Sequence, residues 1–219
     1  KNRILTQAKI SKDGNYIAYS TNEMGQIKVF IKDLNTGNSK RLFKHDQKLE
    51  RINDPSFPIL AWHPSSKILA FSFEKKGEVN FFLYDLEEKK IIKRPPLFLF
   101  EKILDFSYSP DGKKIVLSAV QKGQTDIFVY TLASNYAENL TSDAADDLNP
   151  CFVYGEKKII FSSNRTDDTL RAGMAGSTKS SGQFDLFLLD YEKKSKLLKR
   201  VTNTSDIDEF QAQTNEENE

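Results

Sequence analysis

Apolar and polar residues follow one another in short runs along this chain, and no long stretch has the 3.6-residue period of an amphipathic helix. The clearest example begins with the turn residues Ser109-Pro110-Asp111-Gly112. Proline presets φ at the first central position of such a turn, and glycine accepts a positive φ. The run "KKIVLSA" follows, then a polar loop at Gly123, then the run "DIFVYTL". This pattern predicts a tight turn with Gly112 at positive φ, followed by two strands joined by a short loop.

The same turn–strand–loop–strand unit occurs four times. The first strand of each unit ends in a serine, at Ser20, Ser72, Ser118 and Ser162. Further short runs flank each pair of strands, so each unit carries four strands in about 45 residues, as a β-propeller blade does. We therefore predict an all-β fold of four antiparallel, four-stranded blades. A generic β-sandwich is the alternative, which four aligned units disfavour.

The predicted blades cover residues 1–44, 55–94, 103–141 and 148–203, within one partial propeller over residues 1–219. The segment 204–219 is either the start of a further blade or a disordered tail. Its sequence "SDIDEFQAQ" parallels "SDAADDLNPC" from Ser142, where the fourth blade begins. We expect further blades from a longer chain or a homo-oligomer, because half a propeller leaves sheet faces and edges uncovered.

The third unit, "FSYSPDGKKIVLSA" with "TDIFVYTL" and "ENLT", resembles the TolB-like (WD40-like) β-propeller repeat. The fourth unit resembles it as well and adds Ser163-Asn164-Arg165, although Gly155-Glu156 stands where the repeat has Pro-Asp-Gly. The resemblance implies a propeller of six to eight blades in the bacterial cell envelope, in the periplasm or at the outer membrane. It also implies a protein-binding scaffold. The same repeat forms the propeller in front of prolyl-oligopeptidase-like serine peptidases.

Composition and charge limit the classes of partner and the cellular setting that are expected for this chain. The 32 basic and 31 acidic residues nearly cancel, which gives no support for a nucleic-acid partner. No run of 18 apolar residues is present, so no membrane span is expected. One cysteine excludes an internal disulfide. The chain begins at Lys1 without a signal peptide, and we expect it to be a processed or excised part of a longer protein.

Motifs for catalysis or cofactors are weak. The sequence lacks G-x-S-x-G and H-E-x-x-H, and "GMAGSTKSSG" lacks the spacing of a phosphate-binding loop. With one cysteine and two histidines a zinc site is not expected, and His63 is interpreted as a turn residue. Carboxylates are close in sequence at Asp143, Asp146 and Asp147 and at Asp167 and Asp168, so calcium is possible, but EF-hand spacing is absent. No cofactor is expected.

The feature that stands out is an insertion over residues 164–183, between the two central strands of the fourth unit. Long loops in compact domains are either functional or disordered. In a propeller this loop shares one rim with the loops that join blades. The candidate partner-binding residues are Arg165, Asp167, Asp168, Arg171 and Lys179, with Phe98 and Phe100 from "RPPLFLFEK" as apolar anchors unless they are buried between blades.

The leading hypothesis is a non-catalytic scaffold of the bacterial cell envelope that presents this loop rim to a protein or peptide partner. The alternative is the gating propeller of a prolyl-oligopeptidase-like serine peptidase whose catalytic domain lies outside this chain. A propeller lyase or glycosidase ranks last, because the innermost strands offer mainly Asp105, Lys9 and apolar residues.

Overall fold

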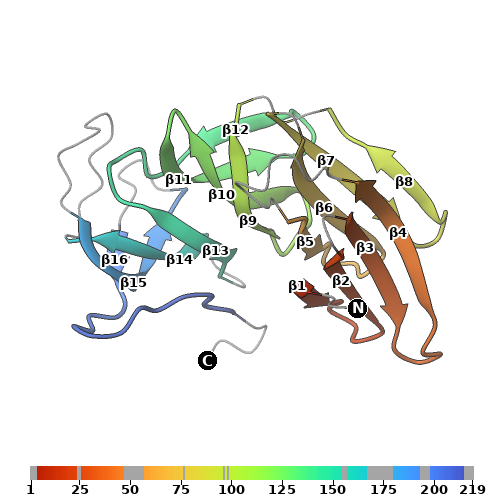
Figure 1. Ribbon diagram of the computed structural model, residues 1–219. Helices are drawn as coiled ribbons and strands as arrows, with labels where there is room; N and C mark the ends of the chain where they lie inside the picture. Colours follow the sequence, from red (N-terminus) through yellow and green to blue (C-terminus); the bar gives the residue numbers. More distant parts are fainter. Residues whose placement is uncertain are drawn as a thin grey trace. The chain divides into compact units, whose positions relative to one another are not determined.

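The computed structural model describes residues 4–23, 26–46, 57–75, 77–95, 97, 99–153, 157–166, 180–192 and 198–214. Sixteen strands form four antiparallel sheets of four strands each, as the repeat predicts (Figure 1). Within this part of the chain, no helix is long and apolar enough to cross a membrane. The chain divides into two compact units, residues 1–98 and 99–219, each holding two of the sheets.

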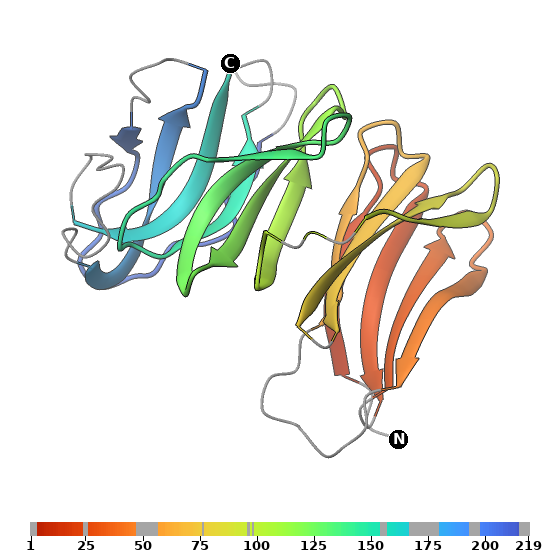
Figure 2. The ribbon, with the colours of Figure 1, turned by 90° about the horizontal axis from the view of Figure 1, so that it is seen from above.

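The first unit contains the sheets β1-β2-β3-β4 and β5-β6-β7-β8. Its strands are β1 (Ile4–Ile10), β2 (Tyr16–Glu23), β3 (Gln26–Asp33), β4 (Ser39–Asp46), β5 (Ile59–Trp62), β6 (Ile68–Lys75), β7 (Glu78–Asp85) and β8 (Lys90–Lys93). The first strands of the two sheets lie next to each other (Figure 2). There, Trp62 Nε1 donates to the Lys9 carbonyl at 2.9 Å. A shared core that includes Leu60, Phe71 and Val29 fills the space between the sheets.

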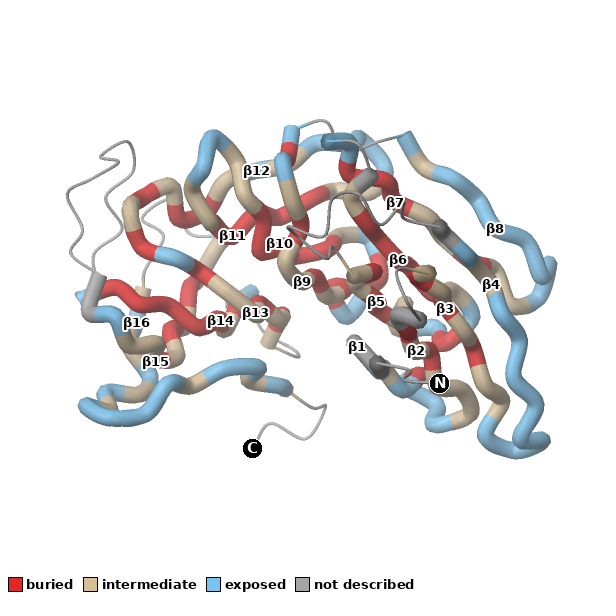
Figure 3. The backbone as a smooth tube through the Cα atoms, viewed as in Figure 1, coloured by how far each residue is buried: buried red, intermediate tan, exposed pale blue. Residues whose placement is uncertain are grey.

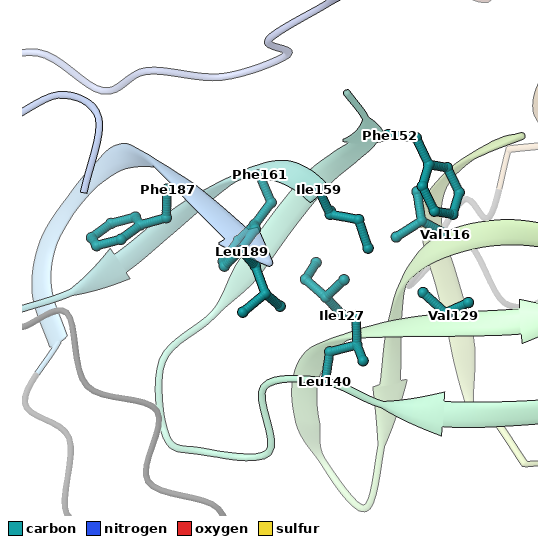
Figure 4. Packing of buried hydrophobic residues seen from close by; sticks show 9 residues of the cluster. All are labelled: Val116, Ile127, Val129, Leu140, Phe152, Ile159, Phe161, Phe187 and Leu189. Carbon is teal, nitrogen blue, oxygen red and sulfur yellow. The ribbon is translucent and has the colours of Figure 1, made fainter. Parts of the chain in front are cut away.

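The second unit repeats this arrangement with the sheets β9-β10-β11-β12 and β13-β14-β15-β16. Its strands are β9 (Lys102–Tyr108), β10 (Lys114–Gln121), β11 (Gln124–Thr131), β12 (Tyr136–Asn139), β13 (Asp147–Phe152), β14 (Lys158–Arg165), β15 (Ser180–Asp190) and β16 (Leu198–Arg200). Nine buried apolar residues drawn from both sheets form its core, among them Val116, Ile127, Phe161 and Phe187 (Figure 4).

In all four sheets, consecutive strands pair and the chain runs up and down without a crossover, which is the topology of a propeller blade. The second and third strands of each sheet contribute most of the buried side chains. The fourth strand is the most exposed, as Figure 3 shows for β8, whose four residues are all exposed. The sequence therefore predicts the architecture correctly, while the number of blades beyond four stays a prediction.

The turn before the second strand has the predicted chemistry. Gly112 has a φ of +70° and donates its N–H to the Ser109 carbonyl at 2.9 Å. The Ser109 hydroxyl donates to the Asp111 carboxylate at 2.6 Å. In the second sheet His63 replaces that serine, and its Nδ1 accepts the Ser65 N–H at 3.1 Å. His63 is thus a turn residue, as predicted, and it holds a β-turn closed.

Candidate functional site

The rim predicted to bind a partner is described in part. Residues 167–179, which include Asp167, Asp168, Arg171 and Lys179, lie outside the described residues, and so does Phe98. The insertion leaves β14 and enters β15 at a defined point, because Arg165 pairs with Ser180 across the two strands. Thr166, which lies within the insertion and directly follows β14, is exposed. The pairing of these two central strands therefore fixes where the connecting loop leaves and re-enters the fourth sheet, at one end of its strands.

Phe100 does not lie on the surface. Only 3% of its area is exposed, and its ring meets the Phe128 ring edge-on, with 4.8 Å between the ring centroids. Its neighbour Leu99 is 55% exposed. Burial, the alternative to an exposed anchor, is therefore what the structure shows for Phe100.

Arg165 also differs from its predicted place, because it is buried completely, with 0% of its area exposed. Its Nη1 lies 2.9 Å from Asp143 Oδ2, and its Nη2 lies 2.8 Å from both carboxylate oxygens of Asp147. Its Nε donates to the Ser163 hydroxyl at 2.9 Å. Each of the three guanidinium nitrogens donates to a group inside the second unit. Arg165 is therefore not an exposed contact for a partner, which corrects its predicted place on the rim.

Burial and charge compete in this cluster of Arg165, Asp143 and Asp147. Burial raises the pKa of Asp147 to about 6, although the Arg165 guanidinium opposes the shift. Burial also disfavours the charged guanidinium, but the carboxylates of Asp147 and Asp143 outweigh it and raise the pKa of Arg165 further. The rings of Phe161 and Phe187 face the guanidinium, with centroids 5.7 and 5.6 Å from its central carbon. The cluster is thus a buried ion triad that joins β13 and β14 to the segment before them.

Two further buried carboxylates, one in each sheet, accept hydrogen bonds from residues at the end of the fourth strand or just after it. Asp126 accepts from Asn139 Nδ2 at 2.9 Å and from the Thr141 hydroxyl at 3.3 Å, and burial raises its pKa. In the next sheet, Asp185 accepts from the Thr204 N–H at 3.1 Å and faces Arg200 Nη2 at 3.4 Å. Both residues hold the chain where it leaves the fourth strand of a blade.

Among the described residues predicted for this rim, Arg165 and Phe100 are buried and do not contribute to its surface. Next to the insertion, the exposed positions include Asp146, Thr166 and the β10–β11 turn at Lys122 and Gly123. The connection between β12 and β13 is held in place, because Gln124 Nε2 donates to the Ala145 carbonyl at 2.8 Å. Among the described residues, no group of three or more histidine, cysteine, aspartate or glutamate side chains is placed to hold a metal ion.

The buried triad was missed by reasoning from the sequence alone, although a signal for it exists. Asp143 precedes β13 and Asp147 begins it, and the only arginine of the second strands closes β14. At the matching positions the third sheet has Ile103 on its first strand and Gln121 at the end of its second. The acidic and basic residues thus appear together in one repeat and are both absent from another.

No family model and no curated protein matches this chain. Among solved structures, it is similar over 94% of its length to TolB from Acinetobacter baumannii, with a TM-score of 0.65 and 18% identity. It is similar over 91% to a putative TolB from Agrobacterium tumefaciens, with a TM-score of 0.63 and 17% identity. It is also similar over 93% to prolyl oligopeptidase B from Galerina marginata, with a TM-score of 0.59 and 13% identity.

These likenesses define the class of fold, a β-propeller of the TolB-like kind, which agrees with the sheets described above. The chain spans 45% of the Acinetobacter protein, 65% of the Agrobacterium protein and 29% of the peptidase. At such identities the likeness concerns the fold alone. Structures of TolB and of a prolyl oligopeptidase both match this fold, so the fold alone does not define the function.

Proposed function

We propose that this protein is a non-catalytic, protein-binding propeller of the bacterial cell envelope. The observation that carries the proposal is the likeness to two TolB structures over more than nine-tenths of the chain. A blade scaffold holds its loops rigidly at one rim, and loops on rigid scaffolds are where binding residues concentrate. The partner is a protein or peptide, and the insertion between β14 and β15 contributes to its site.

The use of the buried carboxylates supports this proposal. Acid–base catalysis needs a carboxylate that can reach a substrate. Asp143 and Asp147 face Arg165 inside the second unit, and Asp126 accepts hydrogen bonds from Asn139 and Thr141. These groups stabilise the blades, which leaves binding by the rim as the role that the described residues favour.

Shortening the insertion tests the proposal. Replacing residues 166–179 by Asn-Gly would join Arg165 and Ser180, which already pair, through a two-residue hairpin turn. We expect the melting temperature to stay within about 2 °C, because the change lies outside the core. The partner is first captured from envelope extract with the unmodified protein, and its affinity is then measured for both forms. We expect the shortened form to bind it about tenfold more weakly or worse.

A matched change at the opposite end of the second unit provides the control. Replacing Ser134, which is exposed in the β11–β12 turn, by Glu should leave the affinity unchanged. If the shortened insertion binds as tightly as the unmodified loop, the insertion is not part of the site.

The second candidate is the gating propeller of a serine peptidase, which the likeness to prolyl oligopeptidase B favours. The two candidates differ in a simple assay. If the native protein purified from its source cleaves a fluorogenic proline-containing peptide, and a serine-directed inhibitor blocks the cleavage, the peptidase candidate replaces the scaffold.

A further inference from the structure

The segment that follows β16 returns to the fourth sheet and lies beside its first strand, β13 (Figure 1). Thr214 Oγ1 donates to the Phe152 carbonyl at 2.8 Å, and Cys151 Sγ lies 3.2 Å from the Ala212 carbonyl. The Glu209 N–H donates to the Phe184 carbonyl at 2.8 Å. We call residues 209–214 the terminal segment.

These contacts repeat those by which β13 lies beside β9. Ser107 in β9 donates to the Pro150 carbonyl at 3.0 Å, and Cys151 holds the position of Ser107 in the next repeat. The residue before each accepting carbonyl has a positive φ, +50° at Asn149 and +59° at Gln211. The terminal segment therefore occupies the place of the first strand of a fifth sheet. Two residues before these positions, Glu209 corresponds to Asp147.

The Asp147 carboxylate has a partner that Glu209 lacks, because it accepts from Arg165 Nη2 at 2.8 Å. Glu209 Oε2 is buried and has no hydrogen-bond partner among the described residues. A buried polar atom without a partner is rare and costly, so Glu209 Oε2 points to a missing group.

The apolar side chains beside the terminal segment are also incompletely covered. Alternate residues of β14 and β15 are only half-buried, namely Ile160, Leu186 and Leu188, whereas both faces of β10 and β11 are largely buried. Phe210 is exposed and rests on Phe184, with 4.9 Å between the ring centroids. An apolar face with an unpaired edge strand is a template for another β-strand.

We propose that the terminal segment is an acceptor edge for a β-hairpin from a further unit of the same repeat, and that this hairpin carries a basic residue that pairs with Glu209. The four described hairpins are not the occupant, because each already pairs with its own first strand. The acidic residues Asp206, Asp208 and Glu209 favour a cationic partner. The basic residue occupies the position that Arg165 holds in β14.

A hairpin from the chain itself serves as the probe. The fluorescent peptide joins residues 157–165 to residues 180–190 through Asn-Gly, so it carries arginine at the required position. We expect it to bind the full chain and to protect the amides of residues 209–214 from hydrogen exchange. Glu209→Gln should weaken binding by about tenfold or more, whereas Asp206→Asn, at an exposed position, should change it by less than about twofold.

A second peptide, with glutamine in place of its arginine, separates charge pairing from strand addition. We expect this peptide to bind about tenfold more weakly than the first, and Glu209→Gln to weaken it no further. Equal binding of both peptides, or no binding of either, would overturn the proposal. One further result would overturn the proposal: the chain associates with itself, Glu209→Gln abolishes this association, and the peptide does not compete with it. The occupant would then be a second copy of the chain.

Discussion

Replacing Arg165 by methionine should destabilise the second unit by about 3–5 kcal/mol. The change removes the cation and leaves Asp143 and Asp147, which have no exposed side-chain area, as two uncompensated buried carboxylates. Methionine fills much of the same volume, so the loss reports charge pairing more than a cavity. The pKa of Asp147 is already raised to about 6 by burial, and it should rise further without the guanidinium.

The measurement must report on the second unit. The single tryptophan, Trp62, lies in β5 of the first unit, so its fluorescence is not informative here. Hydrogen exchange of β14 peptides in increasing urea provides the free energy of opening. Arg200→Met is the control, because Arg200 is partly exposed and should cost much less.

A combined replacement sharpens this test. Changing Arg165, Asp143 and Asp147 together to apolar residues of similar volume should recover most of the loss, since a buried ion cluster and a well-packed apolar cluster are often comparable in stability. A single Arg165→Met variant that opens with an unchanged free energy would show that the triad does not hold β13 and β14 together.

Phe187→Ala should cost about 3–5 kcal/mol, the second large effect. Phe187 is fully buried in the core of the second unit, and its ring centroid lies 6.2 Å from that of Phe161 (Figure 4). The ring also faces the guanidinium groups of Arg165 and Arg200, at 5.6 and 5.1 Å. Alanine should therefore leave a cavity and expose the ion triad to water, and both effects should lower the stability of the second unit.

The same hydrogen-exchange experiment measures this loss. Phe187→Leu, which retains most of the volume, should cost clearly less than Phe187→Ala. Tyr136→Ala, at a position 63% exposed, should change stability by less than about 0.5 kcal/mol. Equal stability of the alanine and leucine variants would mean that Phe187 does not fill the core as described.

The blades could be predicted because their signals are local. Short apolar runs define the strands, and turn chemistry defines their boundaries, as at Ser109 and Gly112. His63 is a turn residue, as predicted, because Pro64 and Ser65 follow it and its Nδ1 accepts the Ser65 N–H. Four repetitions of one pattern made the all-β architecture clear despite variation between units.

Long-range burial was harder to infer. Arg165 stands near the start of a polar insertion, which favours an exposed charge. Its partners Asp143 and Asp147 precede it by 22 and 18 residues on another segment. Phe100 and Leu99 are neighbours in one apolar run, yet the first is buried and the second exposed. A sequence pattern does not say which side of an irregular segment faces the core, so such positions depend on tertiary contacts.

Site-specific photo-cross-linking from Thr166 tests the central claim, that the rim beside the insertion binds a protein, most directly. A photoreactive phenylalanine analogue replaces Thr166 in one variant and Ser134, exposed in the β11–β12 turn, in another. Illumination in envelope extract should yield a discrete protein adduct from position 166 and little or none from position 134. Equal adducts from both positions, or none from position 166, would contradict a binding rim at this end of the second unit.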